Sequence, residues 1–198
     1  MEITENAALV VVDVQKGFEE EHWGKRNNPA AEENIAALID LWQETGRPVV
    51  FVRHDSAEGS RSPLRSGYEG NDFKDFVAER RGKGSGPELL VTKSVNSAFY
   101  GEPSLDAWLR GREIGQIVIV GIQTNMCNET TARMGGNLGY DVVFPLDAMH
   151  TFGLEGPHGW EASADELTRA TAISLHGGGF AKVVTAEDVL RGASAGAR

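Results

Sequence analysis

VIVGIQTNMCNETTARMGG, residues 118–136, joins a run of apolar β-branched residues to a segment with helical spacing. The apolar run predicts a buried strand, and the residues after it predict a helix that begins almost at once. The only cysteine of the chain, Cys127, lies at this junction. A strand followed by a helix is the repeating unit of a parallel sheet, and such sheets bind ligands at the carboxyl ends of their strands. The stretch therefore predicts an α/β fold with a thiol at the ligand-binding edge.

The rest of the chain repeats this alternation of strand and helix. Asn28 with Pro29 after it predicts an N-cap and a first helical position, and Ser163 with Glu166 predicts a capping box. The order favours one parallel sheet covered by helices on both faces. We expect strands over 7–14, 48–54, 89–93, 116–121, 141–146 and 181–186, and helices over 28–46, 103–110, 124–138, 163–179 and 186–191.

Composition and charge restrict the partners and the compartment. The 198 residues are 40% hydrophobic and 24% charged, which predicts a single globular domain over 1–198. A net charge of −10 disfavours nucleic acid as a partner, because that binding needs clustered Lys and Arg. No apolar run approaches the ~20 residues that span a bilayer, and the N-terminus lacks the basic residues of a secretory signal. Because one cysteine cannot form an internal disulfide, we expect a cytoplasmic protein with no membrane partner.

Residues 55–88 interrupt the alternation with a polar stretch rich in Gly and Ser. A connection of this length is uncommon unless it is a lid, a binding loop or disordered. We expect either a lid or a solvated surface loop here. Its GKGSG run lacks the spacing of a phosphate-binding loop.

Three reactive side chains follow the ends of predicted strands. Asp13 ends the first, Lys93 ends the third and Cys127 follows the fourth. An acid, an amine and a thiol at one sheet edge could form a nucleophilic site. If Thr124 is the helix N-cap, the helix dipole would also stabilise a Cys127 thiolate. The alternative is a buried cysteine that packs as a small hydrophobe, with a carboxylate that caps a turn and a lysine that reaches solvent.

Three segments resemble the isochorismatase-like cysteine hydrolases, a superfamily that includes nicotinamidases and carbamoyl-amide hydrolases. They are LVVVDVQKGF (9–18), VTKSVNSAF (91–99) and VIVGIQTNMCNETTARMGGNLGYDV (118–142), and the resemblance extends over about 7–186. It implies a three-layer αβα sandwich on a six-stranded, mostly parallel, Rossmann-like sheet. It also implies hydrolysis of a carbon–nitrogen bond other than a peptide bond.

The resemblance assigns roles to individual residues. Cys127 matches the nucleophile, Asp13 the general acid and base, and Lys93 the third member of the triad. The bond between Ile122 and Gln123 is expected to be cis, so that the backbone N–H groups of Gln123 and Cys127 form an oxyanion hole. The products would be a carboxylate and ammonia or an amine.

Departures from the family pattern bear on metal and substrate. Nicotinamidases hold a metal through an Asp-x-His segment, whereas this chain has His54 before Asp55 and no histidine within 55–149. We therefore expect no metal and no cofactor, and we do not expect nicotinamidase activity. The partners would be water and a small-molecule amide. Candidate classes are primary amides, ureido and N-carbamoyl compounds, and lactams such as that of a streptothricin-type antibiotic.

Other expectations concern the pocket and the assembly. The family resemblance also implies a homo-oligomer. For each aromatic side chain near the site, ordinary packing is an equal alternative. A non-catalytic small-molecule binding protein and a redox-responsive thiol protein are the alternative functions. Candidate pocket residues are Phe18, Trp23, His54, Phe99, Tyr100 and Asn128.

Overall fold

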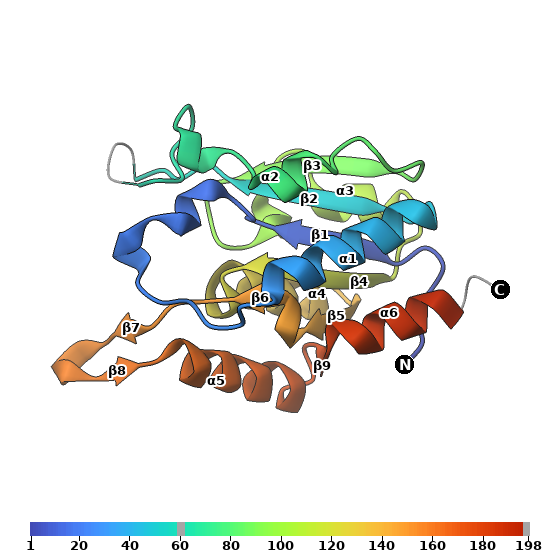
Figure 1. The fold of residues 1–198 in the computed structure, drawn as a ribbon. Helices are drawn as coiled ribbons and strands as arrows, with labels where there is room; N and C mark the ends of the chain where they lie inside the picture. Colours follow the sequence, from blue (N-terminus) through green and yellow to red (C-terminus); the bar gives the residue numbers. More distant parts are fainter. Residues whose placement is uncertain (59–61, 196–198) are drawn as a thin grey trace.

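The centre of the molecule is a parallel sheet with the strand order β3-β2-β1-β4-β5-β9 (Figure 1). The computed structural model describes residues 1–58 and 62–195. The strands are β1 (Ala8–Val12), β2 (Val49–His54), β3 (Glu88–Lys93), β4 (Gln116–Ile122), β5 (Asp141–Pro145) and β9 (Lys182–Val184). All their pairings are parallel, which confirms the α/β prediction.

Among the described residues the central sheet has seven strands, one more than the six that were predicted. A seventh strand, β6 (Met149–His150), pairs with the end of β4 next to Gly121 and Ile122. Two residues are too few to produce a periodic pattern in the sequence, so β6 could not be predicted from it.

Helices cover both faces of the sheet. Successive side chains of β1 point to opposite faces, so each face is apolar and packs into its own hydrophobic cluster. Leu9 and Val11 pack with α1 (Ala31–Glu44) and α6 (Ala186–Ala195) on one face. Val10 and Val12 pack on the other face, where α3 (Leu105–Arg110), α4 (Glu129–Asn137) and α5 (Ala164–Gly177) lie (Figure 1). Among the described residues, no helix is long and apolar enough to cross a membrane.

Two of the predicted helix starts, at Asn28 and at Ser163, have different outcomes. The capping box is confirmed, because Ser163 Oγ accepts the Glu166 N–H while Glu166 accepts the Ser163 N–H. The prediction of Asn28 as a cap is wrong, since Ala30 holds the N-cap position of α1. Asn28 instead adopts a φ of 44° and donates its side-chain N–H groups to the carbonyl oxygens of Leu146 and Met149. It therefore ties the start of α1 to the loop after β5.

The segment 55–88 is packed over much of its described part. It carries α2 (Asp75–Ala78). Its Leu64, Phe73 and Val77 are buried in the hydrophobic cluster between the sheet and α1. The Lys74 N–H donates to the Val14 carbonyl oxygen, which ties the segment to the chain after β1. The described part of the segment is therefore partly packed against the body of the protein, and the choice between a lid and a surface loop stays a prediction. Residues 59–61 of the segment lie outside the described residues.

Gly121 brings the end of β4 against β1. Its φ is 132°, and a Cβ atom here would collide with the Val12 carbonyl oxygen. Only glycine allows this approach without strain. The close contact places the turn after β4, which carries Cys127, beside Asp13 at the end of β1.

Candidate active site

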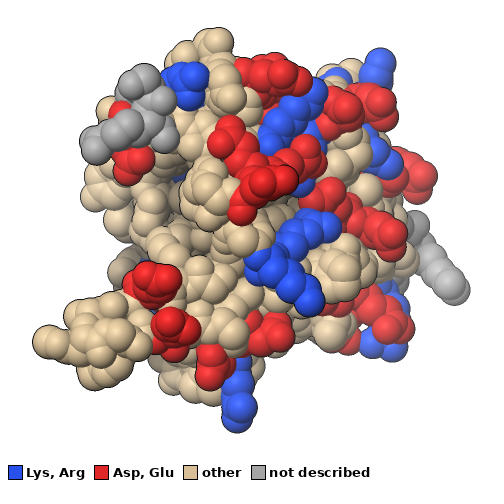
Figure 2. Space-filling model, turned by 60° about the vertical axis from the view of Figure 1, so that its left-hand side comes forward, with Lys and Arg blue, Asp and Glu red and all other residues tan. Residues whose placement is uncertain are grey.

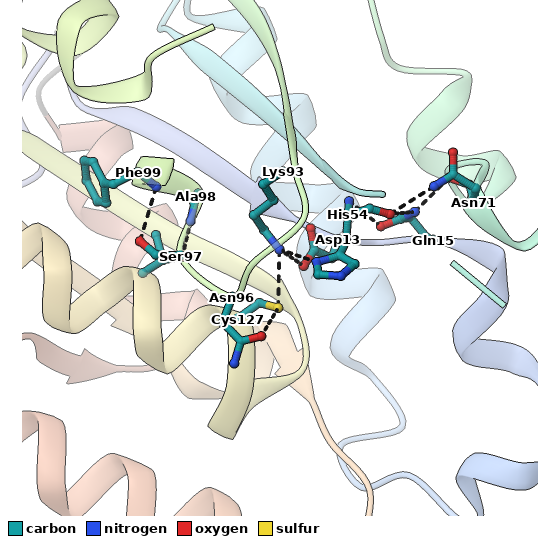
Figure 3. Close-up of polar contacts among 11 residues, drawn as sticks. Asp13, Gln15, His54, Asn71, Lys93, Asn96, Ser97, Ala98, Phe99 and Cys127 are labelled. Carbon is teal, nitrogen blue, oxygen red and sulfur yellow. Dashed lines mark hydrogen bonds and ion pairs between the residues drawn. The ribbon is translucent and has the colours of Figure 1, made fainter. Parts of the chain in front are cut away.

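Asp13, Lys93 and Cys127 meet at the carboxyl ends of β1, β3 and β4 (Figure 3). The Lys93 ammonium lies 2.6 Å from Asp13 Oδ2 and 3.4 Å from Cys127 Sγ. The side chains of Lys93 and Asp13 are completely buried, and Cys127 is nearly so. The structure therefore brings together the three residues that the strand ends indicated, with the ammonium bridging the carboxylate and the sulfur.

Asp13 is held by its backbone and has one unused carboxylate oxygen. Its φ of 52° is a left-handed conformation that aspartate tolerates better than most residues. Its N–H donates to Val52 O, and its carbonyl oxygen accepts from the Gln15 N–H. Within the described residues Oδ1 has no hydrogen-bond partner although it is buried. Since a carboxylate oxygen of Asp13 lies within 4.8 Å of Cys127 Sγ, Asp13 can serve as a proton acceptor.

The turn that carries Cys127 differs from the predicted helix start. Thr124–Asn128 forms a π-helical turn with Gln123 at the N-cap position, so the expected Thr124 cap is wrong. Burial raises the pKa of Cys127, the Asp13 carboxylate raises it further, and Lys93 only partly opposes them. The net shift is opposite in direction to the stabilised thiolate that the sequence suggested, and it favours a neutral thiol. A nucleophilic role for this thiol would therefore need a base that removes its proton.

Lys93 keeps its charge in this environment. Burial lowers the pKa of Lys93, but Asp13 and Cys127 more than offset that effect, so the pKa is raised. The buried site thus holds a charged ammonium between the Asp13 side chain and the Cys127 sulfur.

The loop after β3 places Lys93 relative to α4. Ser97 caps a short 3-10 turn (Ala98–Tyr100), and the Ala98 N–H donates to Thr131 Oγ1 of α4 at 3.0 Å. Asn96 Oδ1 lies 3.9 Å from Cys127 Sγ. Sequence reasoning did not single out Asn96, although it lies within the VTKSVNSAF segment.

His54 lies at the end of β2, next to Lys93 in the register of the sheet. Its Nδ1 is 3.0 Å from Lys93 Nζ. Burial lowers the pKa of His54 and the Lys93 charge lowers it further, which favours a neutral imidazole. The sequence indicated His54 only as a pocket residue, because strand register is needed to see that it adjoins Lys93.

Asp13, His54 and Cys127 also make up a donor set of the kind that holds Zn²⁺, with ligand atoms within 4.8 Å of one another. The Lys93 ammonium lies among these atoms, at 2.6, 3.0 and 3.4 Å from Asp13, His54 and Cys127. The group does not fit a metal ion while Lys93 occupies this position. The cation of the site is the lysine side chain.

The Ile122–Gln123 peptide bond is cis, as the family resemblance implied. Gln123 is buried, and its Oε1 accepts a hydrogen bond from the Thr151 hydroxyl. Thr151 follows β6 directly, so the unpredicted strand supports the residue that precedes the Cys127 turn.

The other expected pocket residues have diverse surroundings. Phe18 packs against Trp23 and Phe152, with ring centroids 5.2 and 6.4 Å away, in an aromatic cluster beside α1. Phe99 stacks on Tyr140 at 5.7 Å and packs near α4. Tyr100 is 70% exposed.

Asn128 follows Cys127 and is completely buried. Neither polar atom of its side chain has a hydrogen-bond partner within the described part of the chain. Of the expected pocket residues, only His54 has a hydrogen bond to the triad among the described contacts.

Comparison with known proteins gives a consistent result. A model of the isochorismatase domain matches residues 7–188. YrdC of Bacillus subtilis, an uncharacterized isochorismatase family protein, is 37% identical over 94% of this chain and 95% of its own. The ureidoacrylate amidohydrolase RutB of Variovorax paradoxus is 33% identical over 84% and 82%. Nicotinamidase 3 of Arabidopsis thaliana is 29% identical over 93% and 87%.

The fold is also similar to that of solved structures. The crystal structure of an isochorismatase-family protein from Chromobacterium violaceum superposes with a TM-score of 0.89 and 32% identity. The match covers 98% of this chain and 97% of that one. The layered sheet described above is therefore the fold of these proteins.

Proposed function

Because this chain belongs to the isochorismatase family, we propose that it is a cysteine-dependent hydrolase of a small, non-peptide amide. The observation that carries the proposal is the buried Lys93 ammonium, which contacts both the Asp13 carboxylate and the Cys127 sulfur. A carboxylate beside a thiol provides a base and a nucleophile, and a cation beside both stabilises the charge that develops.

In the proposed reaction, Asp13 accepts the thiol proton as Cys127 Sγ attacks the amide carbonyl carbon. The raised pKa of Cys127 supports this order, because the base acts during the attack rather than before it. Asp13 then gives the proton to the leaving nitrogen as the C–N bond breaks, which leaves a thioester on Cys127. Water attacks the thioester with Asp13 as base, and the products are a carboxylic acid and ammonia or an amine.

The oxyanion of each tetrahedral intermediate is assigned to the backbone N–H groups of Gln123 and Cys127. Their support is the position of Gln123 at the start of the π-helical turn that carries Cys127. One preorganised donor of this kind contributes about 3 kcal/mol to the transition state.

The substrate class is supported by the relatives and by the site. Ureido and N-carbamoyl compounds have an amide bond of the type that the ureidoacrylate amidohydrolase acts on. Nicotinamide is a further candidate substrate because one relative is a nicotinamidase. The Lys93 ammonium lies among the ligand atoms of Asp13, His54 and Cys127, which argues against a metal at that position. Lactams are the third candidate class.

The proposal also includes a homo-oligomeric assembly and a cytoplasmic location. The hairpin of β7 (Leu154–Glu155) and β8 (Glu161–Ala162) projects from the body in Figure 1 and forms the protrusion at lower left in Figure 2. On this hairpin Leu154 and Trp160 are 39% and 69% exposed, and Glu155 faces Glu161 directly across the strands. The exposed apolar side chains of a projecting hairpin support packing against a second copy of the chain, that is, a homo-oligomer. The single free thiol supports a cytoplasmic location.

Light scattering of the native protein and of Trp160→Ser tests the homo-oligomer. We expect the variant to have a smaller mass at equal concentration. A native monomer, or an unchanged mass in the variant, would contradict this role of the hairpin.

The hydrolase proposal is tested by a panel of amides followed by mass spectrometry of the products. The panel holds nicotinamide, N-carbamoyl amino acids, ureides and lactams, each incubated with native protein and with Cys127→Ala. Turnover of one class that disappears in Cys127→Ala would support the hydrolase and name its substrate. If native protein binds a panel compound without hydrolysing it, the binding-protein alternative replaces the proposal.

A further inference from the structure

We propose that His54 is a positioning residue that fixes the Lys93 ammonium through its Nδ1 atom. This inference rests on the proposed function of the same site, and it adds a fourth side chain to the triad. It replaces the expectation that His54 contacts the substrate.

The ammonium of Lys93 has three N–H groups, and three acceptors surround it. They are Asp13 Oδ2 at 2.6 Å, His54 Nδ1 at 3.0 Å and Cys127 Sγ at 3.4 Å, and Figure 3 shows the contacts meeting at one nitrogen. A buried ammonium must satisfy all its donors, since an unpaired one carries a desolvation penalty. His54 supplies the acceptor that neither the carboxylate nor the sulfur provides.

This contact defines the protonation state of the imidazole. Lys93 can only donate, so Nδ1 must accept and the single ring proton of neutral His54 lies on Nε2. Burial and the adjacent Lys93 charge both lower the pKa of His54, which keeps the ring in this neutral form. A protonated His54 would instead place two cations 3.0 Å apart.

The backbone of His54 is fixed on both sides. Its N–H donates to Gln15 Oε1 at 2.8 Å, and its carbonyl oxygen accepts from Gln15 Nε2 and Asn71 Nδ2 at 3.0 and 2.9 Å. Gln15 and Asn71 are themselves buried and joined, because Gln15 Nε2 also donates to the Asn71 carbonyl oxygen. The polar clamp of Gln15 and Asn71 therefore sets the end of β2 and, with it, the imidazole.

The consequence for catalysis concerns the contact of Lys93 with sulfur. The contact to Cys127, at 3.4 Å, is made to sulfur, the weakest acceptor of the three, and is the first that a freed ammonium would lose. Lys93 lowers the pKa of the Cys127 thiol against the larger effects of burial and Asp13. Without His54 the ammonium would turn away from the sulfur, and the thiol would become harder to deprotonate.

Three substitutions of His54 distinguish the role of Nδ1 from that of Nε2. Asparagine places its side-chain oxygen near the position of Nδ1, glutamine places its own near Nε2, and leucine has no acceptor. For the substrate found by the panel, we expect His54→Leu to lower kcat by about 10- to 100-fold with little change in KM. We expect His54→Asn to recover kcat to within about threefold of native and His54→Gln to remain low. The distant, exposed His176 gives a matched control, since His176→Asn should retain the native kcat.

A second readout needs no substrate. The rate at which iodoacetamide alkylates Cys127 should fall by about tenfold in His54→Leu at fixed pH and return in His54→Asn. If native protein hydrolyses no amide but this alkylation pattern holds, the proposed function fails and the role of His54 stands.

The opposite results would overturn the role of His54. One is native kcat and native alkylation in His54→Leu. Another is a raised KM that only His54→Gln restores, which would assign Nε2 to substrate binding. If His54→Leu fails to fold, the comparison of His54→Asn with His54→Gln still decides between the two nitrogens.

Discussion

Lys93 Nζ and Asp13 Oδ2 form a 2.6 Å ion pair in which neither side chain has any exposed surface. An ion pair removed from water gains Coulomb energy but loses hydration, so it adds little net stability on average. Each charge nevertheless depends on the other, because either one alone would be buried and uncompensated. The pair is therefore best explained by the chemistry it makes available beside Cys127.

The first prediction concerns this dependence. Lys93→Met removes the cation and leaves a buried carboxylate, so we expect it to lower the free energy of unfolding by about 3–5 kcal/mol. The double variant Asp13→Asn with Lys93→Met removes both charges and should recover most of that loss. Urea denaturation at pH 7 measures both. Equal destabilisation of the single and double variants would show that the pair is not coupled in this way.

A second prediction concerns the contact of β4 with β1. Gly121→Ala places a methyl group against the Val12 carbonyl oxygen in a left-handed conformation, so we expect a loss of about 3 kcal/mol or more, or no folded protein. Gly115, just before β4, has open space around its Cβ position and serves as the control. Gly115→Ala should stay within about 1 kcal/mol of native. Normal folding of Gly121→Ala would contradict the close approach.

A third prediction concerns His150 on β6. The ring is 1% exposed, and neither of its nitrogens has a hydrogen-bond partner among the described residues. Burial lowers the pKa of His150 to about 3, and the charges of Arg26 and Lys74 add to this effect while Glu32 opposes it. Since the unfolded pKa is about 6.5, only the unfolded chain binds this proton between pH ~6.5 and ~3.

The stability that His150 contributes at neutral pH should therefore be lost as the pH falls through this window. The loss is of the order of several kcal/mol in total. His150→Leu removes the titration, so its unfolding free energy should decline less steeply below pH 6.5 than that of the native protein. Parallel pH curves for the two proteins would show that His150 does not titrate in this manner.

The sequence predicted the main features of the fold because buried strands and amphipathic helices have strong periodic signals. The run before Gly121 and the capping box at Ser163 are examples that the structure confirms. It missed β6, which is too short for a pattern, and it misassigned Asn28, whose side chain bonds to the distant Leu146 and Met149. Local residue preferences contain no information about such long-range partners.

The same distinction applies to the site. The positions of Asp13, Lys93 and Cys127 follow from strand ends, so their convergence could be anticipated. The direction in which the pKa of Cys127 shifts could not be anticipated, because the shift depends on the extent of burial and on the placement of Asp13. The contact of His54 with Lys93 required the register of β2 with β3 and the clamp of Gln15 on the His54 backbone.

The thioester on Cys127 is tested most directly by the intact mass of the protein, acid-quenched during turnover of the substrate that the panel identifies. We expect a species heavier by the acyl group of the substrate, with the added mass on the peptide that contains Cys127, and no such species in Cys127→Ala. Hydrolysis at the native rate by Cys127→Ala, or an acyl group on another residue, would rule out Cys127 as the nucleophile.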